Sequence, residues 1–230
     1  MSIPAHTRSE EDHLKAVHAL VQEGAAAGTK DLADRLGTRS SSVTVMLKKL
    51  AAKGLLKHEP YYGVKLTAKG KAAALKLVRK HRLWETFLVD RLGFGWDEVH
   101  EVAEQLEHVR SEKLTEKLAE YLGDPAYDPH GDPIPDRAGN MPLRDVKALS
   151  DCNAAARVRI VAVEDGSDAL LQLLAQKGIG IGKVFTLVGR QDFDQSVELS
   201  SADGAMLSLS ARVASHLLVQ PAAARKPKQA

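Results

Sequence analysis

GTRSSSVTVMLKKLAAKGLLKHEPYYGVKL, residues 37–66 of the 230-residue chain, is the stretch that decides the fold. Its first part, Ser40 to Lys53, has the apolar periodicity of a helix, and Gly54 can end that helix. Leu55 to Lys57 and Val64 to Leu66 follow as short strands around a turn, which is typical of a β-hairpin. A helix that runs directly into such a wing predicts a winged helix.

Two helices upstream complete this motif. The first is expected from Asp12 to Glu23, and Thr29 can cap a second helix that closes at Gly37. Three helices followed by a hairpin form a winged helix-turn-helix, a module that binds DNA. We therefore predict that residues 1–76 are a DNA-binding domain.

Two long helices are expected downstream of the wing. Thr67 can cap one that ends at Leu92, and Asp97 can cap another that ends at Leu122. Five prolines then interrupt the chain up to residue 142 and predict a loop. Residues 77–142 thus form a predicted helical domain whose long helices are suited to packing in a dimer.

The C-terminal part alternates short apolar runs with turn residues. Residues 143–155 are expected to be a linker, and residues 156–220 a small β-barrel. The predicted elements of the barrel are a strand from Val158 to Val163, a helix from Asp168 to Gln176, and strands at Val184–Val188, Val197–Leu199 and Met206–Leu209. The tail, residues 221–230, is expected to be disordered. The fold class is mainly α with small β units.

Charge is distributed unevenly along the chain. The sequence holds 32 Lys and Arg against 30 Asp and Glu, but residues 1–76 carry a net charge of +6 and residues 77–142 a net charge of −6. A basic N-terminal region favours contacts with nucleic-acid phosphates, and an acidic middle region supplies carboxylates for cations.

Cysteine usage and hydropathy point to a cytoplasmic protein. The single cysteine, Cys152, excludes a disulfide framework and a cysteine-rich zinc module, and it fits a reducing compartment. The first residues lack the apolar core of a signal peptide, and no apolar run approaches the length of a membrane span. We expect no membrane partner.

The start of the third helix carries small hydroxyl side chains, which can approach base edges and phosphates closely. The free N–H groups at this helix end also favour phosphate oxygens. An arginine just before the helix can reach a guanine edge or a phosphate, and lysines farther along lie where backbone contacts usually fall. The candidate DNA contacts are Thr29, Arg39, Ser41, Ser42, Thr44, Lys48, Lys49, Lys53 and Tyr62.

Histidines and glutamates recur at helical spacing in the two long helices. They are His81 and Glu85 on the first helix, and His100, Glu104, Glu107 and His108 within one arc of about 100° on the second. Nitrogen and oxygen donors without a thiolate favour Mn(II), Fe(II), Zn(II) or Co(II). The six side chains therefore predict a metal site.

An enzymatic function is the first alternative for these residues. His and Glu sets on helices also build di-iron oxidases in four-helix bundles, but the second helix lacks the Glu-x-x-His spacing that such oxidases need. We therefore expect neither an enzyme nor a small-molecule substrate.

The sequence resembles the iron- and manganese-dependent repressors typified by the diphtheria toxin repressor and the manganese transport regulator. The resemblance covers nearly the whole chain and rests on Ser41–Thr44, Leu66–Gly70, Arg79–Leu83, Glu104–His108 and Gly131–Pro135. It implies a winged-helix domain, a helical dimerisation domain that holds the metals, and a C-terminal SH3-like (FeoA-like) domain.

The resemblance also implies two sets of metal ligands. The primary set is Asp12, Glu104, Glu107 and His108, the second set is His81, Glu85 and His100, and Glu164, Asp165 or Asp168 are candidates for a further ligand from the C-terminal domain. Iron-sensing members place a Met and a Cys where this chain has Asp12 and Glu104. Oxygen donors there favour Mn(II), then Fe(II), with other divalent transition metals able to bind in vitro. Lys15 stands where short manganese sensors have a carboxylate, which argues against their closely spaced binuclear arrangement.

Taken as a member of this family, the chain is expected to be a homodimeric repressor that binds operator DNA when Mn(II) or Fe(II) is bound, and that controls metal uptake and homeostasis genes. Asp12 belongs to the DNA-binding domain and its partners to the dimerisation domain, so a bound ion would tie the two together. The alternative is a metal-independent winged-helix protein with a structural metal site.

Overall fold

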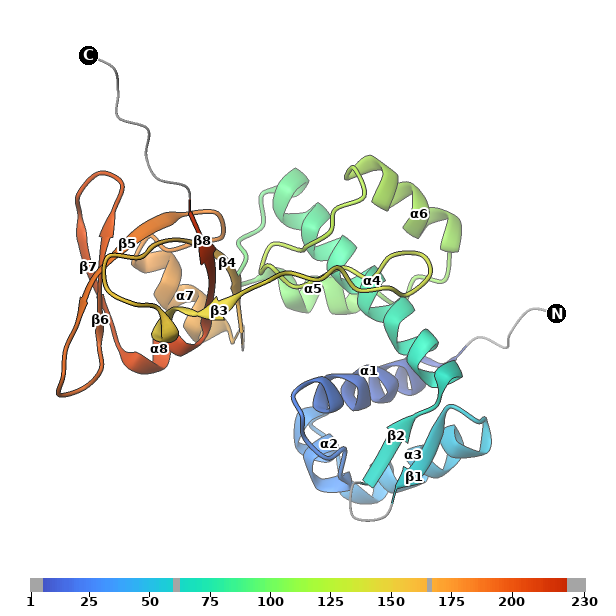
Figure 1. Ribbon diagram of the computed structural model, residues 1–230. Coiled ribbons are helices and arrows are strands. Elements are labelled where there is room, and N and C mark those ends of the chain that lie inside the picture. The colour runs from blue at the N-terminus through green and yellow to red at the C-terminus, as the bar shows by residue number, and fades with distance from the viewer. Residues whose placement is uncertain (1–5, 60–62, 165–166, 223–230) are drawn as a thin grey trace. The chain divides into compact units, whose positions relative to one another are not determined.

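The computed structural model of the chain describes residues 6–59, 63–164 and 167–222 (Figure 1). These residues form two compact units. The described residues of the first unit are 6–59, 63–84, 103–124 and 134–141, and those of the second are 85–102, 125–133, 142–164 and 167–222. Within the described ranges, every helix is too short or too polar to cross a membrane.

The first unit begins with the predicted winged helix-turn-helix. Its elements are α1 Arg8–Gln22, α2 Thr29–Arg35, α3 Ser40–Ala52, β1 Leu56–Glu59 and β2 Gly63–Leu66. Val17, Leu32 and Leu50 are completely buried, because each helix turns its apolar residues toward the other two. The expected arrangement of three helices and a wing is confirmed.

Helix α1 begins earlier than its predicted start at Asp12. The Thr7 side chain accepts a hydrogen bond from the Glu10 backbone, and the Glu10 side chain accepts one from the Thr7 backbone. This reciprocal pair is a capping box, which satisfies two backbone N–H groups at the helix start. Asp12 therefore lies inside the helix and is free of any capping role.

Helix α2 differs from the prediction at its cap. Gly28 occupies the N-cap position, and Thr29 is the first helical residue, with a half-buried side chain. A hydroxyl at that position is too far along the helix to cap it, because the cap residue must precede the first helical turn.

The wing packs against the segment before α2. Gly63 begins β2 with a φ of 76°, and a Cβ atom there would lie 2.3 Å from the Ala27 carbonyl oxygen. Glycine is needed at this position for both reasons. Tyr62, a predicted DNA contact, lies outside the described residues.

A buried carboxylate joins α1 to α3. The Glu10 side chain is completely buried, and its Oε1 lies 2.6 Å from Lys53 Nζ and 3.1 Å from Lys49 Nζ. Burial by itself raises the pKa of this carboxyl, but hydrogen bonds from Lys53, Thr7 and Lys49 lower it to about 2. Two of the lysines that are expected to contact DNA therefore also hold α3 against α1.

Helix α4, Ala68–Leu92, has the length that the sequence predicts. The Thr67 hydroxyl accepts a hydrogen bond from the Gly70 backbone and so caps the helix, as expected.

The prediction of a second long helix from Asp97 to Leu122 is wrong. The chain forms two shorter helices, α5 Val99–Leu106 and α6 Glu112–Tyr121. Ser111 accepts a hydrogen bond from the Leu114 backbone and begins α6 as its N-cap. Apolar periodicity continues across the break, so that only this capping serine marks it in the sequence.

The second unit contains a six-stranded antiparallel sheet in the order β3-β8-β4-β5-β6-β7. Its elements are β3 Lys147–Ala148, η1 Leu149–Asp151, β4 Arg157–Val163, α7 Asp168–Gln176, β5 Val184–Arg190, β6 Val197–Ser201, β7 Met206–Leu209, α8 Ala211–Ser215 and β8 Leu217–Pro221. Ile160, Leu187 and Leu199 of the sheet share one core with Leu174 of α7. The expected small β domain is confirmed.

Strands β3 and β8 and helix α8 are not indicated by the sequence pattern. Strand β8 pairs with β4, with Pro221 opposite Val158, so that Pro221 ends a strand where a tail is predicted. Proline is tolerated there because a strand end can lack an N–H donor. Strand β3 lies within 143–155, the expected linker, and residues 223–230 of the expected tail lie outside the described residues.

The buried carboxylate between α1 and α3 predicts a pH-dependent stability. We expect Glu10→Gln to lower the free energy of unfolding by roughly 2–3 kcal/mol above pH 5, because the carboxyl has a pKa of about 2 when folded and 4.5 in its ordinary state. The stabilisation is lost as the pH falls from 4.5 toward 2, so the wild type and the variant converge in acid.

Urea unfolding followed by circular dichroism at pH 7 and pH 3 measures this difference. Glu23→Gln, at the exposed end of α1, is the matched control and is expected to change little. If Glu10→Gln lowered the free energy of unfolding by the same amount at both pH values, the result would contradict the low pKa assigned to Glu10.

Candidate metal centre

The break after α5 separates the predicted ligands. His100 and Glu104 lie on α5, whereas Glu107 and His108 lie in the turn that follows it. The sequence predicts that these four side chains share one helical face, and this prediction is wrong. Glu107 and His108 approach α1, while His100 approaches α4.

Asp12, Glu107 and His108 form the first group of candidate ligands. One ligand atom of each lies within 4.8 Å of the other two. The His108 Nε2 atom is 3.1 Å from Asp12 Oδ1 and 3.8 Å from Glu107 Oε1. Glu107 is buried and the other two side chains are partly buried. Two carboxylates and one imidazole offer the oxygen and nitrogen donors that Mn(II) and Fe(II) accept.

The charges of this group are only partly balanced by the chain. Burial raises the pKa of Asp12 above its ordinary value, and the negative charge of Glu107 raises it further against the opposing effect of His108. Burial also opposes ionisation of Glu107, but a hydrogen bond from His81 and the charge of Lys15 hold its pKa below the ordinary value. A cation would be favoured here, and protons would compete with it for Asp12.

Glu11 is a partner of His108 that the sequence analysis missed. Its Oε2 lies 2.7 Å from His108 Nδ1. We assign the proton to Nδ1, which donates to Glu11 and leaves Nε2 to face Asp12 and Glu107. A carboxylate in this position orients the ring and raises the basicity of the nitrogen that would bind a metal.

Glu107 is also tied to two residues outside the first group. Its Oε2 lies 2.6 Å from His81 Nδ1 and 2.7 Å from Lys15 Nζ. The short contact to His81 assigns a proton to Nδ1 of that ring as well, which leaves Nε2 as its ligand atom.

Glu104, a predicted primary ligand, does not enter the first group in this structure. Its side chain is half-exposed, and its Oε1 lies 3.7 Å from Lys15 Nζ. The place of Glu104 in the ligand set therefore stays a prediction.

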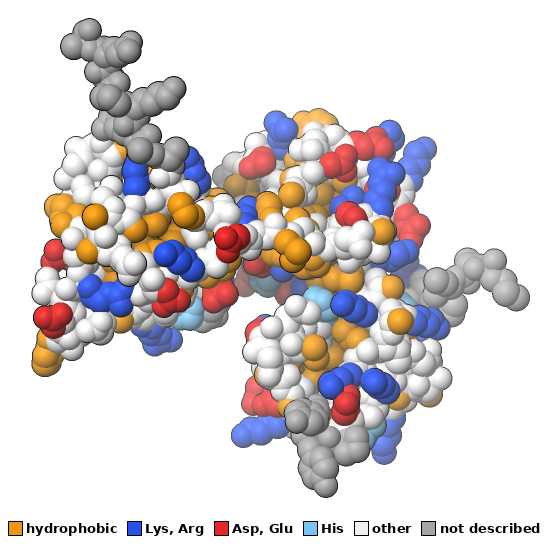
Figure 2. Space-filling model, in the orientation of Figure 1, with side chains coloured by type: hydrophobic (Ala, Val, Ile, Leu, Met, Phe, Trp, Pro, Cys, Tyr) orange, Lys and Arg blue, Asp and Glu red, His pale blue; other side chains and the backbone are white. Residues whose placement is uncertain are grey.

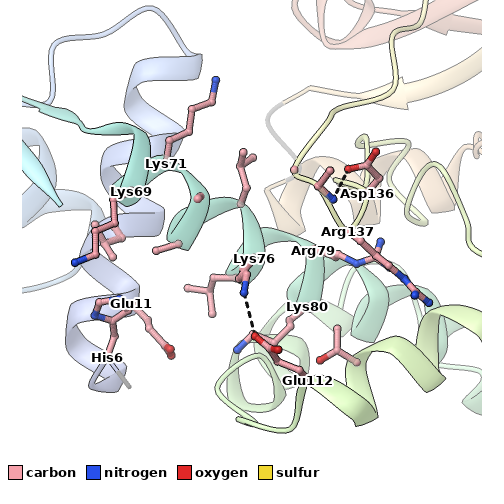
Figure 3. Close-up of a pocket in the computed structure, with 18 of the residues that line it drawn as sticks. His6, Glu11, Lys69, Lys71, Lys76, Arg79, Lys80, Glu112, Asp136 and Arg137 are labelled. Atoms are coloured by element: carbon pink, nitrogen blue, oxygen red, sulfur yellow. Dashed lines mark hydrogen bonds and ion pairs between the residues drawn. The ribbon is translucent and has the colours of Figure 1, made fainter. Parts of the chain in front are cut away.

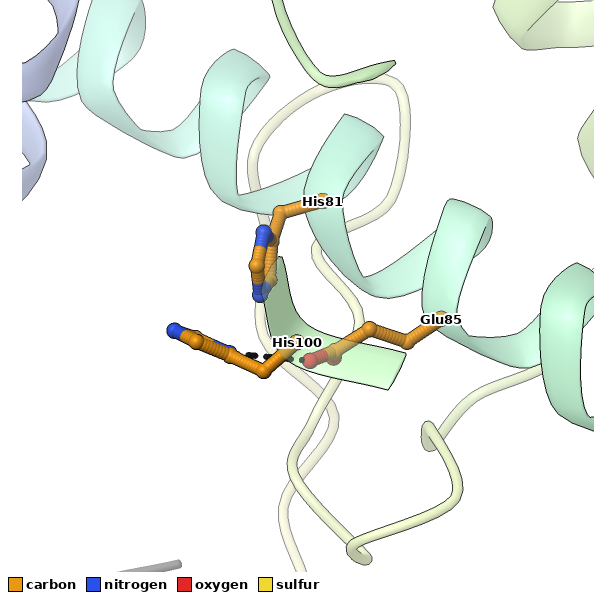
Figure 4. A group of neighbouring side chains, drawn as sticks. All are labelled: His81, Glu85 and His100. Atoms are coloured by element: carbon orange, nitrogen blue, oxygen red, sulfur yellow. Dashed lines mark hydrogen bonds and ion pairs between the residues drawn. The ribbon is translucent and has the colours of Figure 1, made fainter. Parts of the chain in front are cut away.

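The second predicted set is His81, Glu85 and His100 (Figure 4). His81 and Glu85 extend from the same side of α4, one turn apart. The His100 Nδ1 atom lies 3.2 Å from Glu85 Oε1, and the His100 side chain is half-exposed. Helical spacing on α4 and the approach of α5 are what bring these donors together.

Glu85 also belongs to a group that the sequence analysis missed. Glu85, Asp128 and His130 are all buried, and one ligand atom of each lies within 4.8 Å of the others. His130 Nε2 lies 2.6 Å from the Trp96 carbonyl oxygen, to which we assign its donated proton, and Nδ1 lies 3.9 Å from Glu85 Oε2. The available signal was an Asp and a His on either side of Pro129, in a stretch interpreted only as a loop.

The backbone fixes this loop to the β-sheet. The Val163 N–H donates to the His130 carbonyl oxygen at 3.0 Å. Gly131, with a φ of 87°, comes so close that a Cβ atom would collide with the Val161 carbonyl oxygen. The glycine is required at this contact, and it holds His130 in place.

The C-terminal candidates are not drawn into these groups. Glu164 and Asp168 are exposed, and among the described residues neither joins a cluster of possible ligands. Asp165 lies outside the described residues. Their participation stays a prediction.

Helix α3 presents its predicted DNA contacts to solvent. Arg39, Ser41, Ser42 and Lys48 are exposed, and Lys48 takes part in no ion pair in the part of the chain that the structure describes. Thr44 is exposed too, but its hydroxyl donates to the Ser40 carbonyl oxygen at 2.9 Å. Figure 2 shows Lys and Arg side chains over the visible face of the winged-helix part.

A groove of about 1250 Å³ in the first unit is lined by parts of α1, α4 and α6 (Figure 3). Some of its charged side chains pair with one another, as Lys76 does with Glu112 at 3.0 Å. Glu11 lines the same groove, so the carboxylate behind His108 is accessible from it. We assign the groove no ligand.

Three segments of the chain match known protein families. Residues 6–64 match "Iron dependent repressor, N-terminal DNA binding domain", residues 67–136 match "Iron dependent repressor, metal binding and dimerisation domain", and residues 147–221 match "FeoA domain". The domain boundaries predicted above stay predictions.

The chain is also similar to curated proteins. It is 37% identical over 102 residues to the iron-dependent repressor IdeR of Mycobacterium leprae, a match that covers 44% of this chain and 44% of that protein. It is 36% identical over 102 residues to the HTH-type transcriptional regulator MntR of Lysinibacillus sphaericus (strain C3-41), covering 44% of this chain and 73% of that one. The match thus spans less than half of the length of the IdeR relative.

A solved structure resembles nearly the whole chain. It is described as "Manganese-dependent transcriptional repressor complex with manganese", is 37% identical, and gives a TM-score of 0.82. The similarity covers 93% of this chain and 100% of that one.

The contact between Glu11 and His108 generates a prediction about metal affinity. We expect Glu11→Gln to weaken Mn(II) binding roughly 10- to 100-fold, because the His108 ring loses the carboxylate that orients it. Isothermal titration calorimetry measures the change. Glu112→Gln is the control, since it removes a carboxylate from the same groove without touching His108. An unchanged Mn(II) affinity in Glu11→Gln would show that the contact is incidental.

Proposed function

This chain belongs to the iron-dependent repressor family, and on that premise we propose that it represses transcription by binding operator DNA when Mn(II) occupies the Asp12, Glu107 and His108 group. One observation carries the proposal. The His108 Nε2 atom faces both Asp12, in the segment that matches the DNA-binding domain, and Glu107, in the segment that matches the metal-binding domain.

The residues present fit a divalent transition metal. Two carboxylates of limited exposure and an imidazole nitrogen converge, and Glu11 holds the other nitrogen of that imidazole. A donor set of oxygen and nitrogen, with the only cysteine buried elsewhere, favours Mn(II) and then Fe(II) over softer ions. When bound, the ion supplies positive charge that the carboxylates share. His81, Glu85 and His100 are the proposed second site, with Glu104 as a proposed fourth ligand of the first.

The mechanism follows from where the ligands lie on the chain. Asp12 is on α1, whereas Glu107 and His108 follow α5, so ligands that engage one ion fix α1 relative to that turn. Glu10, two residues before Asp12, is held by Lys49 of α3 and by Lys53, the C-cap residue of that helix. A constraint on α1 therefore reaches the helix that presents Ser41 and Ser42. By linkage, DNA in turn tightens metal binding.

The proposed assembly is a homodimer on double-stranded DNA in the cytoplasm. The matched dimerisation segment includes α6, on which the large apolar side chains of Leu114 and Tyr121 are exposed. Apolar exposure on a helix of this kind suits contact with a second copy of the chain. The curated relatives are transcriptional regulators, and we propose no enzymatic activity for this chain.

The competing function is a metal-independent winged-helix protein with a structural metal site. Both functions allow metal binding, but only a metal-dependent repressor requires Mn(II) for DNA affinity. Titration of DNA binding against Mn(II), and then against a chelator, separates them.

Asp12 is the ligand whose loss tests the mechanism. We expect Asp12→Ala to leave a folded protein, because Thr7 and Glu10 cap α1 and Asp12 does not. Glu107 and His108 can still hold a cation, with reduced affinity, but no residue of α1 then binds it directly. The contacts of Glu11 with His108 and of Lys15 with Glu107 remain, and they are present without the ion as well. Metal-stimulated DNA binding should fall at least about 10-fold even at saturating Mn(II).

Calorimetry with Mn(II) measures how much metal the variant binds. Fluorescence anisotropy with DNA that flanks the protein's own gene measures how strongly Mn(II) stimulates DNA binding by the same variant. Glu23→Ala removes a carboxylate from the far end of α1 and is the control. Full Mn(II)-dependent DNA affinity in Asp12→Ala would refute the proposed coupling.

The two neighbouring lysines of α3 are expected to differ in their effect on DNA binding. A plot of the logarithm of the DNA-binding constant against the logarithm of the salt concentration has a negative slope. Lys48→Ala should make this slope shallower by about one unit, because an exposed lysine that contacts phosphate releases one counterion. Lys49→Ala should flatten it less, because Glu10 already neutralises part of the Lys49 charge. Anisotropy titrations at several salt concentrations measure both slopes, and equal slopes would contradict the prediction.

A further inference from the structure

Lys15 places a positive charge beside the first group of candidate ligands. It lies on α1, one turn after Asp12, and its side chain is only 21% exposed. Its Nζ is 2.7 Å from Glu107 Oε2, 3.7 Å from Glu104 Oε1 and 3.2 Å from His81 Nδ1. The ammonium is therefore held among the acidic and imidazole side chains from which a metal would also draw its ligands.

The two oxygens of Glu107 have different partners. Oε2 accepts the hydrogen bonds of Lys15 and His81, and Oε1 faces His108 Nε2 and the group that includes Asp12. An ion bound by that group and the ammonium of Lys15 would be separated by a single carboxylate. Glu107 is buried, so solvent screens little of the interaction between the two cations.

The charge of Lys15 lowers the affinity for a divalent cation through its effect on both the metal-free and the metal-bound site. Without metal, the ammonium neutralises part of the negative charge of Glu107 and Glu104, which stabilises the empty site. With metal, it repels the ion and draws electron density from the shared carboxylate. Both effects lower the affinity for a divalent cation.

We propose that Lys15 sets the metal affinity of this centre by competing, as a cation built into α1, for the charge of Glu107. The inference rests on the proposed metal site at Asp12, Glu107 and His108. Lys15 is a positioning residue in this account, because it acts on the ion through Glu107. A sensor with this lysine responds at a higher metal concentration than the same site would without it.

Substitutions that remove the charge of Lys15 test this. Calorimetry with Mn(II) at pH 8, where the carboxylates are ionised, is expected to show binding that is about tenfold tighter in Lys15→Met and in Lys15→Gln than in the wild type. Lys15→Arg keeps the charge and should stay within about threefold of the wild type. Lys30→Met removes an exposed charge from α2 and should leave the affinity unchanged.

The midpoint of Mn(II)-activated DNA binding should shift to lower concentration by the same factor as the dissociation constant. Thermal unfolding followed by circular dichroism identifies a variant that does not fold, and either neutral variant is then sufficient. Unchanged or weaker Mn(II) binding in a folded neutral variant overturns the inference about Lys15. Failure of the wild type to bind Mn(II) at all overturns the proposed function instead, so the two failures are distinguishable.

Discussion

The buried carboxylate of Glu107 is the group on which the candidate centre depends. A buried charge is costly unless nearby groups compensate it, and here His81 and Lys15 contact one oxygen while the other faces His108 and Asp12. The compensating groups come from α4 and α1, and the carboxylate itself follows α5. One carboxylate therefore draws together three segments that are distant in sequence, and it connects the His81 ring of the second proposed site to the first.

Helix α1 connects the candidate centre to the rest of the winged-helix part through the contacts of four of its side chains. Successive residues of a helix are rotated by about 100°, so neighbours in sequence face different surroundings. Glu10 faces the lysines of α3, Glu11 holds one nitrogen of His108, and Asp12 faces the other. Lys15, one turn later, returns to the side of Asp12 and reaches Glu107. A single turn of helix thus links the DNA-facing helix, the orientation of a ligand and the proposed ion.

Much of the fold could be predicted because local signals in the sequence agree with the tertiary structure. Apolar periodicity, with Val17, Leu32 and Leu50 at buried positions, places each helix of the winged-helix part. Gly54 follows α3 before the wing, and Gly63 begins the second strand of the wing. Thr67 begins α4 where a capping residue is expected. The candidate ligands Glu107, His108, His81 and Glu85 were visible as residue types at helical spacing, and Asp12 entered through the resemblance to a family. In each case, residues close in sequence carry the information.

Only the tertiary structure decided how those residues divide into groups. Helix α5 ends at Leu106, which separates His100 on the helix from His108 in the turn that follows. Apolar periodicity does not reveal this break, because both short helices bury the same kind of residue. Glu11 and Asp128 looked like ordinary surface charges, and Lys15 was singled out only through the resemblance to a family, since nothing local shows which distant side chain a carboxylate or an ammonium will meet. By itself the sequence determined the elements and the chemical types of donor. Their pairing depends on burial and on contacts between segments up to 97 positions apart, as in Glu11 with His108, and those are set when the helices pack.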